Sequence, residues 1–304
     1  MPRRVGSAAL SCVPFLDRRC LAVQALIDSA RRKESSLVVG LDPVPSRFPK
    51  ELQHLPAAEA VQDFCRSILE AVEPHAAAVK LQAAFFERLG TPGMEVYGTL
   101  ISDAASLGLP TIADVKRGDI GPVAAAYAEA HLAVYGASCV TVNPFMGEDA
   151  VRPFLEEARR LGRGGGVFVL VATSNPSAER FQGATAPPLF EVAARLVAEL
   201  GGGGSGGDYP DAGAVVGATR PEVGRRVREL LPRALFLVPG YGAQGGGAAG
   251  IRPLLDSSGA GVLVNSSRAV IYAHETSQTD YRKAAGEAAK DARDELRSAG
   301  VRPA

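Results

Sequence analysis

Two acids and a lysine lie close together in one short stretch of the chain, residues 111–122. Asp114 and Lys116 are separated by a single residue, and Asp119 follows after an Arg-Gly pair. Alternate side chains of a β-strand point to the same face, so Asp114 and Lys116 are expected on one face and Val115 on the other. Charged side chains are costly to bury unless they are paired. The stretch therefore predicts a cluster of mutually paired charges where a strand ends.

Other polar side chains also follow the ends of apolar runs. In chain order they are Asp42, Lys80, Gln82, Asn143, Thr173, Ser174, Asn175, Gln244, Asn265 and Arg268. A single buried lysine or aspartate is more often half of a structural ion pair than a catalyst. Two acids and two lysines on adjacent strands are harder to explain in that way, because burying so many charges requires mutual pairing. Such clusters mark functional sites, so a site is favoured here.

Eight apolar runs alternate with segments of helical spacing. The runs cover 37–43, 76–82, 110–116, 138–144, 167–174, 212–219, 234–240 and 261–267. The helical segments cover 15–33, 56–72, 93–107, 122–135, 149–161, 188–200, 221–231 and 281–299. The runs are continuously apolar, as expected of strands covered on both faces. This α/β pattern predicts a single-domain (β/α)8 TIM barrel. A doubly wound open sheet is the alternative, but no GxGxxG follows the first run.

The predicted barrel spans residues 15–300, after a flexible lead-in at 1–14. One interruption, the Gly-rich loop 201–207, is predicted to be a flexible surface loop. A natural insertion and an engineered linker both fit its composition. The loop joins a helix to the next strand, so it is expected at the end of the barrel opposite the polar cluster.

A second Gly-rich stretch, residues 238–247, follows the seventh run. Its glycines allow backbone N–H groups to turn toward an anion. The loops after strands seven and eight of such barrels are a frequent phosphate site, and Arg268 supplies a bidentate fork for phosphate oxygens. A surface loop without a ligand is the alternative; the position of the loop and Arg268 favour a phosphate site.

The composition argues against several other classes of function. There are 33 Lys plus Arg and 33 Asp plus Glu, so no nucleic-acid or membrane partner is expected. No apolar run approaches the ~18 residues that span a membrane, and the N-terminus is a weak match to a signal peptide. Four cysteines without CxxC spacing predict reduced thiols in a cytoplasmic protein. The four histidines are far apart in the chain, so no metal site is predicted.

The stretch from Asp114 to Ile120 resembles the DxKxxDI signature of the orotidine 5′-phosphate decarboxylase family. Further segments resemble that family in the same order: 41–43, 79–87, 141–145, 173–176, 239–246 and 265–268. The resemblance extends from about Phe15 to Ala273 and beyond. The Lys-Arg-Gly and Thr-Ser-Asn-Pro forms resemble the bacterial branch of slightly longer chains.

The resemblance implies decarboxylation of orotidine 5′-phosphate to UMP, the last step of de novo pyrimidine nucleotide synthesis, without cofactor or metal. Lys116 would stabilise the C6 carbanion and protonate it, beside Asp114 at the departing carboxylate. Lys80 and Asp119 would complete an alternating Lys-Asp-Lys-Asp array. Asp119 would come from the partner subunit of a homodimer and reach across to the ribose.

The resemblance also implies a set of substrate-binding residues: Asp42, Asn143, Ser174, Tyr241, Gln244, Gly245, Asn265 and Arg268. Asp42 would bind ribose hydroxyls together with Lys80, and Ser174 would bind the pyrimidine. The loop after the seventh strand and Arg268 would hold the phosphate. Where the family usually has a threonine that reaches the partner's ligand, this chain has Val123, which cannot donate that hydrogen bond.

Two other functions stay open. DxKxxD is shared with a metal-dependent keto-sugar-phosphate decarboxylase of the same superfamily, but Ser174 and the uncharged neighbours of Lys80 disfavour that reading. A non-catalytic nucleotide-binding barrel is the other, and the intact set of four charged residues argues against it.

Overall fold

Eight parallel strands form a closed barrel in which each strand pairs with the next in the chain and β8 pairs with β1. The computed structural model describes residues 23–201, 209–241, 248–277 and 279–304. The strands are β1 Leu37–Leu41, β2 Ala78–Gln82, β3 Thr111–Arg117, β4 Cys139–Val142, β5 Gly166–Ala172, β6 Ala212–Val216, β7 Phe236–Val238 and β8 Val262–Ser266. All eight predicted strands are confirmed, and with them the TIM barrel.

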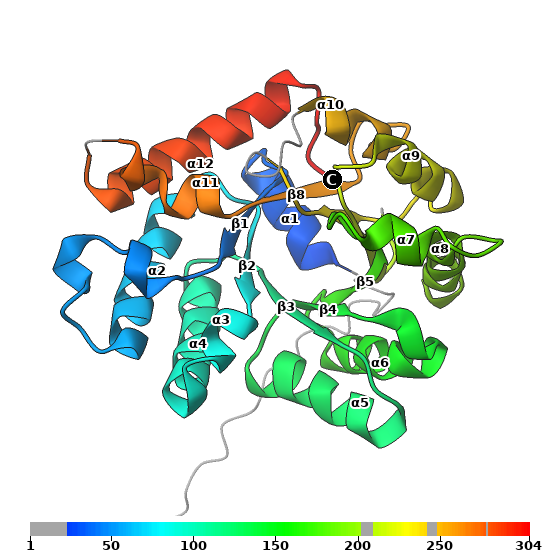
Figure 1. Ribbon diagram of the computed structural model, residues 1–304, viewed down its shortest axis with the longest axis horizontal. Coiled ribbons are helices and arrows are strands. Elements are labelled where there is room, and N and C mark those ends of the chain that lie inside the picture. The colour runs from blue at the N-terminus through cyan, green and yellow to red at the C-terminus, as the bar shows by residue number, and fades with distance from the viewer. Residues whose placement is uncertain (1–22, 202–208, 242–247, 278) are drawn as a thin grey trace, which may run out of the picture.

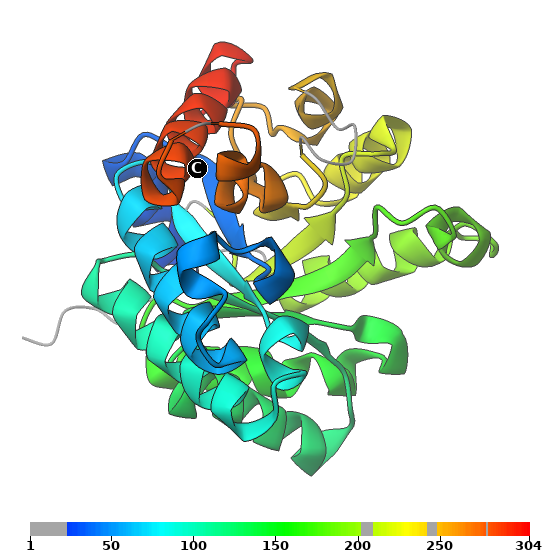
Figure 2. The same cartoon turned by 60° about the vertical axis from the view of Figure 1, so that its left-hand side comes forward.

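Helices surround the strands (Figure 1, Figure 2). The longer ones are α1 Gln24–Arg32, α2 Ala57–Val72, α4 Gly90–Ser106, α5 Gly121–Ala128, α6 Arg152–Leu161, α8 Leu189–Leu200, α9 Pro221–Leu230 and α12 Tyr281–Ser298. All lie within predicted helical segments or extend them by a few residues. A π-helix, Glu129–Val134, continues α5 where one regular helix was predicted.

Short helices at the strand ends were not predicted, because four or five residues are too few to show a helical period. They are α3 Ala84–Glu87, α7 Ala178–Gln182, α10 Ala248–Ile251 and α11 Arg268–Ile271. Single turns of 3-10 helix cover Pro45–Arg47, Lys50–Leu52, Pro144–Met146, Glu148–Ala150, Arg252–Leu254 and Ala273–Glu275. The predicted lead-in 1–14, the start of the first predicted helix and nearly all of the Gly-rich loop 201–207 lie outside the described residues.

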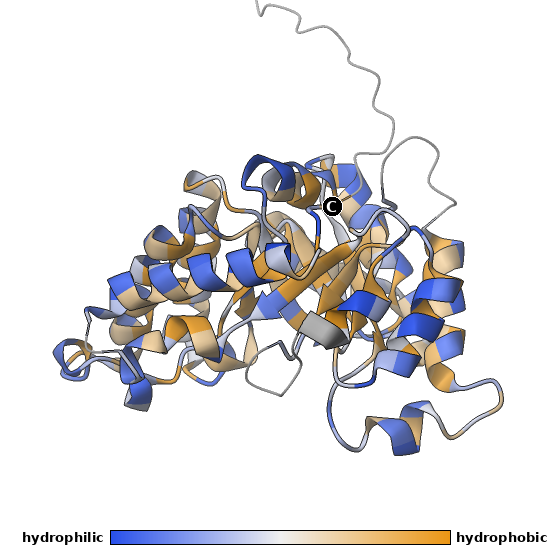
Figure 3. Ribbon diagram, turned by 90° about the horizontal axis from the view of Figure 1, so that it is seen from above, coloured by the Kyte–Doolittle hydropathy of each residue, from blue (hydrophilic) through white to orange (hydrophobic). Residues whose placement is uncertain are grey.

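Apolar side chains form two layers. The larger layer lies between the strands and the helices. The smaller one fills the interior of the barrel, with Val38, Ala78, Ile112, Cys139, Phe168 and Leu263 from six of the strands and Leu235 directly before β7. Val23, Leu26, Ile27 and Ala30 join it from α1 and its N-cap. The end of the barrel against which α1 packs is therefore closed by apolar side chains. Figure 3 shows the hydrophobic colour concentrated on the strands and both colours on the outer helices.

Strand geometry places the next inward-facing side chain two residues further along each strand. At that level Lys80 follows Ala78, Asp114 follows Ile112, Thr141 follows Cys139 and Asn265 follows Leu263. On β2, β3, β4 and β8 the inward-facing side chains therefore change from apolar to polar in one step, at the ends where the strands finish. In barrels of this kind, that end carries the chemistry.

No helix in the described ranges is long and apolar enough to cross a membrane.

Candidate active site

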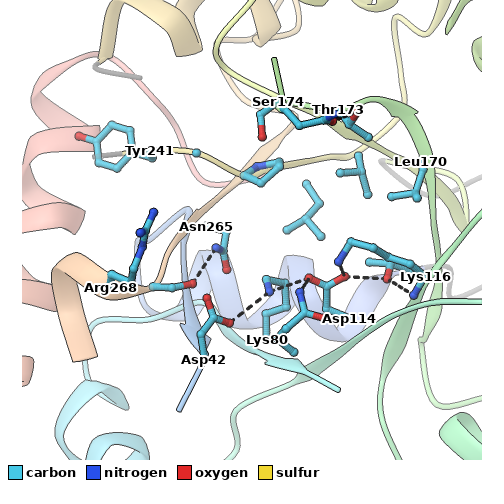
Figure 4. A pocket seen from close by; sticks show the side chains of 18 residues that line it. Asp42, Lys80, Asp114, Lys116, Leu170, Thr173, Ser174, Tyr241, Asn265 and Arg268 are labelled. Carbon is cyan, nitrogen blue, oxygen red and sulfur yellow. Dashed lines mark hydrogen bonds and ion pairs between the residues drawn. The ribbon is translucent and has the colours of Figure 1, made fainter. Parts of the chain in front are cut away.

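Asp114 is the centre of the polar cluster, and four side chains donate hydrogen bonds to its carboxylate (Figure 4). Lys80 Nζ lies 2.8 Å and Gln82 Nε2 3.0 Å from Oδ2. Thr141 Oγ1 lies 2.9 Å from Oδ1, and Lys116 Nζ contacts the same oxygen. Both oxygens of this buried carboxylate are therefore fully engaged.

The two lysines decide the ionisation of Asp114. Burial by itself raises the pKa of Asp114, but the charges of Lys80 and then Lys116, with their hydrogen bonds, hold that pKa well below its usual range. Burial lowers the pKa of Lys80, yet Asp114 and Asp42 hold that pKa above its ordinary value. Each charge thus keeps its neighbour charged, which satisfies the pairing that burial requires.

Lys80 also connects the cluster to β1, because its Nζ lies 4.0 Å from Asp42 Oδ1. That oxygen is buried and accepts no hydrogen bond from the described residues, and the same holds for Asn265 Oδ1. Buried acceptors normally have a donor. Both residues line the same cavity, so these oxygens are available to hydroxyl or N–H groups of a ligand.

Strand β3 is not the regular strand that the sequence predicted. Ala113 pairs with Val140 and Arg117 with Val142, so β3 advances four residues while β4 advances two. Lys116 has φ 48°, in the left-handed region that non-glycine residues rarely adopt. The predicted faces survive: Asp114 and the Lys116 amine meet inside the barrel, whereas Val115 joins the outer apolar layer. Bulges of this kind re-aim side chains beside active sites.

A cavity of about 450 Å³ opens above the cluster. Three apolar side chains, Leu170, Val215 and Leu237, continue the inward-facing rows of β5, β6 and β7. The charged side of the cavity consists of Asp42, Lys80, Asp114 and Lys116. One wall is thus ionic and the opposite wall apolar, a combination that suits a flat ring carrying a charged substituent on one edge.

The predicted pyrimidine and phosphate contacts lie on the far rim. Ser174 lines the cavity with its hydroxyl pointing inward, and Arg268 extends from the start of α11 toward the segment after β7 (Figure 4). Tyr241 lines the cavity too, but its hydroxyl points away (Figure 4). Burial and then Glu295 raise the pKa of Tyr241. Gln244 and Gly245 lie outside the described residues.

Two predicted site residues do not reach this cavity. Asn143 is exposed, and its Oδ1 accepts a hydrogen bond from Phe145 N at 3.0 Å, capping the turn Pro144–Met146. Strand β4 ends at Val142, so the chain has already turned away at Asn143. Asp119 Oδ1 accepts from Ile120 N at 2.8 Å, and the residue does not line the cavity of its own chain.

Two polar residues of the cavity, Thr141 and Ser267, were absent from the predicted cluster of polar side chains. Gln82, Thr173 and Asn175 were predicted in that cluster without an assigned role, and they line the cavity. For Thr141 a signal existed. It stands two residues beyond the inward-facing Cys139, just as Lys80 and Asp114 stand two beyond their own apolar neighbours. Among the described residues, no three His, Cys, Asp or Glu side chains are grouped so that they could hold a metal ion.

Residues 35–284 match the family model described as Orotidine 5′-phosphate decarboxylase / HUMPS family. The chain belongs to this family.

Relatives named orotidine 5′-phosphate decarboxylase match over most of the chain. The one from Rhodopirellula baltica is 42% identical over 260 residues, 80% of this chain and 85% of the relative. The one from Deinococcus radiodurans is 42% identical over 278 residues, 91% and 97% of the two chains. The solved structure of Leishmania donovani OMP decarboxylase has a TM-score of 0.74 at 30% identity, and the match covers 92% of this chain and 98% of that one. The relatives from Rhodopirellula baltica and Deinococcus radiodurans confirm the predicted bacterial family, and the structural match confirms the predicted fold.

Proposed function

We propose that this protein decarboxylates orotidine 5′-phosphate to UMP. Its relatives are named orotidine 5′-phosphate decarboxylase. The observation that carries the proposal is the buried carboxylate of Asp114, which lies between the ammonium groups of Lys80 and Lys116 at the edge of a cavity large enough for a nucleotide base. An anion beside a cation suits a reaction that expels CO2 and then needs a proton at the same carbon.

In the proposed reaction, the substrate carboxylate lies against Asp114. The bond between C6 and the carboxylate breaks, the electron pair stays on C6, and CO2 leaves. The Lys116 ammonium stabilises the developing carbanion and then transfers a proton to C6, giving UMP. The neutral amine of Lys116 afterwards takes a proton from water. The side chain of Lys116 is 44% accessible to solvent, whereas that of Asp114 is 9% accessible. The Lys116 amine can therefore reach water in that last step.

Repulsion between Asp114 and the substrate carboxylate is too weak to account for the whole rate. Two unit charges ~4 Å apart at an effective dielectric of ~20 interact by about 4 kcal/mol. Enzymes typically lower barriers by about 8–23 kcal/mol. The larger share is therefore assigned to stabilisation of the carbanion by Lys116 and to binding energy from the remote phosphate.

The binding roles follow the position of each residue in the cavity. Asp42 and Lys80 would bind the ribose hydroxyls, since the free Asp42 oxygen lies beside the Lys80 amine. Ser174 would bind the pyrimidine. Arg268 would bind the phosphate, with Tyr241, Gln244 and Gly245 in the loop after β7. Asn265 offers a further free acceptor, and Asn143 is a binding residue only if the turn that it caps rearranges.

A homodimer completes the array in this proposal. Apolar side chains are exposed around Asp119 and on the neighbouring turn after β4: Ile120 53%, Val123 46%, Tyr127 36%, Phe145 71% and Met146 48%. A patch of this kind fits an interface between copies of the chain. Val123, in place of the family threonine, would then contribute an apolar contact.

We also propose that residues 15–300 form a single domain and that the protein is located in the cytoplasm.

The test is Lys116→Ala, with Lys50→Ala at an exposed position as the matched control. Loss of orotidine 5′-phosphate is followed by absorbance, and UMP affinity is measured by calorimetric titration. We expect Lys116→Ala to abolish turnover and to retain UMP binding, while the control stays fully active. Near-normal turnover by Lys116→Ala would refute the mechanism. Loss of activity in the wild type when a chelator is added would favour the metal-dependent alternative.

A further inference from the structure

We propose that Thr141 is a positioning residue, whose one hydroxyl fixes both the Asp114 carboxylate and the backbone of Lys116. The inference rests on the proposed function, because it assigns Thr141 a part in the same chemistry. Thr141 is 1% exposed and lies at the wall of the cavity. It is thus part of the buried frame around the two charged residues.

The direction of both hydrogen bonds is fixed by chemistry. The backbone N–H of Lys116 can only donate, and it lies 3.0 Å from Thr141 Oγ1. The carboxylate of Asp114, held ionised, can only accept, and its Oδ1 lies 2.9 Å from the same oxygen. The hydroxyl proton must therefore point at Asp114 while a lone pair receives the Lys116 N–H. Thr141 Oγ1 thus orients both the Asp114 carboxylate and the backbone at Lys116, whose side chain carries the ammonium group.

The register of the barrel gives Thr141 this position. Between the paired residues Ala113–Val140 and Arg117–Val142, three residues of β3 stand opposite a single residue of β4, which is Thr141. The regular ladder is interrupted there, so the Lys116 N–H has lost its usual backbone partner on the neighbouring strand. A side-chain oxygen has taken its place.

Lys116 needs that support because its backbone is strained. A φ of 48° is unfavourable for a residue with a Cβ, and such conformations persist only where the surroundings hold them. Without the acceptor, the peptide before Lys116 is free to relax, and the amine would move relative to C6 of the substrate. Asp114 would still keep three donors, from Lys80, Gln82 and Lys116. The charge state of the cluster would survive while its geometry would not.

Loss of the Thr141 hydroxyl should therefore change the position of the Lys116 amine but not the charges around it, and this difference determines the expected kinetic constants. A small misplacement of a reacting group can reduce the rate by about a hundredfold. The nucleotide is held mainly by groups away from Thr141, so its affinity should change little. Replacing Thr141 should therefore lower kcat much more than it changes KM or UMP affinity.

The experiment compares Thr141→Val, which exchanges the hydroxyl for a methyl group, with Thr141→Ser, which keeps the hydroxyl. The measurements are kcat, KM, UMP affinity by titration, and the thermal midpoint. We expect Thr141→Val to lower kcat by about tenfold to a hundredfold with UMP affinity within about threefold of the wild type. Thr141→Ser should recover most of the lost kcat.

Three results would overturn the inference. These are full kcat in Thr141→Val, equal loss of kcat in both variants, or a loss of kcat that is matched by equal losses of UMP affinity and thermal stability. If Thr141→Val does not fold, Thr141→Ala removes the same hydroxyl without adding volume and is judged by the same criteria. Failure of the proposed function is distinguishable, because wild-type protein would then show no turnover of orotidine 5′-phosphate at all.

Discussion

Buried ionisable side chains occur both inside the barrel and among the surrounding helices, and their partners decide whether they carry charge. On the interior side, Asp114 and Lys80 form an ion pair and stay ionised. On the helix side, His131 is 4% exposed and its Nδ1 lies 3.3 Å from the hydroxyl of Tyr97. Burial, and then the charge of Arg117, lower the pKa of His131 to about 4. Burial therefore keeps His131 neutral, whereas Asp114 stays charged because its lysine partners outweigh the effect of burial.

Folding stability should therefore fall in mild acid because of His131. Between its ordinary pKa of about 6.5 and its folded value, the unfolded chain binds a proton that the folded chain does not. Stability is thus lost as the pH falls. From pH 7 to pH 5 this residue should cost about 2 kcal/mol.

Urea denaturation of the wild type and of His131→Gln at the two pH values measures that cost. The variant should lose about 2 kcal/mol less than the wild type. His54→Gln, at an exposed position, is the control and should follow the wild type. Equal acid losses in the wild type and His131→Gln would show that folding does not lower the pKa of His131.

At the scale of elements, the ends of β1 and β8 fit together only because β1 carries a glycine. Gly40 pairs in register with Lys80. A Cβ placed on Gly40 would lie 1.9 Å from Ser267 Oγ and 3.0 Å from Asn265 Oδ1. Those two side chains line the cavity and hydrogen-bond to each other at 3.2 Å. The missing side chain on β1 is therefore what lets β8 present its polar groups.

Gly40→Ala should consequently displace Ser267 and weaken UMP binding, with a loss of about 1–3 kcal/mol in unfolding free energy from overpacking. Calorimetric titration and urea denaturation provide the two values. The double variant Gly40→Ala with Ser267→Gly removes the nearest clash and should recover most of the stability. If the single variant binds UMP normally, the contact between β1 and β8 does not shape the site.

The sequence was sufficient to predict the strands and the longer helices, but not the short helices or the irregularities of the strands. The strands were predictable because each apolar run is covered on both faces. The bulge of β3 was not, because Thr111–Lys116 has the pattern of an ordinary strand and the extra residues show only against β4. Asn143 was placed in the site because polar residues at strand ends usually point inward, whereas β4 ends at Val142. Lys80, Asp114, Lys116 and Asp42 were predictable, since charges in apolar strands need one another.

At the scale of the whole molecule, substitution of Asp119 can test whether two chains contribute residues to one site. It does not line the cavity of its own chain and is flanked by exposed apolar side chains. Lys116→Ala and Asp119→Ala should each be nearly inactive. In a mixed dimer with Asp119 acting in the partner's site, one site carries both substitutions and the other carries neither.

Mixing the two inactive variants under conditions of subunit exchange should thus restore activity, to at most about a quarter of the wild-type value. The assay is loss of orotidine 5′-phosphate, and each variant incubated alone is the control. Mass measurement of the mixture checks that subunits have exchanged. Exchange without recovered activity would place Asp119 in its own chain's site or outside the chemistry.

The apolar side chains inside the barrel limit the routes by which substrate and products can reach and leave the polar cluster. Phe168, Ile112 and Leu263 fill the barrel below the charged cluster, and Leu26 of α1 packs against them from the other end. The described part of the barrel is thus a well with one opening. Substrate, CO2 and UMP must all pass the rim where Ser174 and Arg268 stand. A nucleotide held by its phosphate at that rim would also hinder the escape of the gas formed beneath it, so departure of UMP would clear the well for the next turnover.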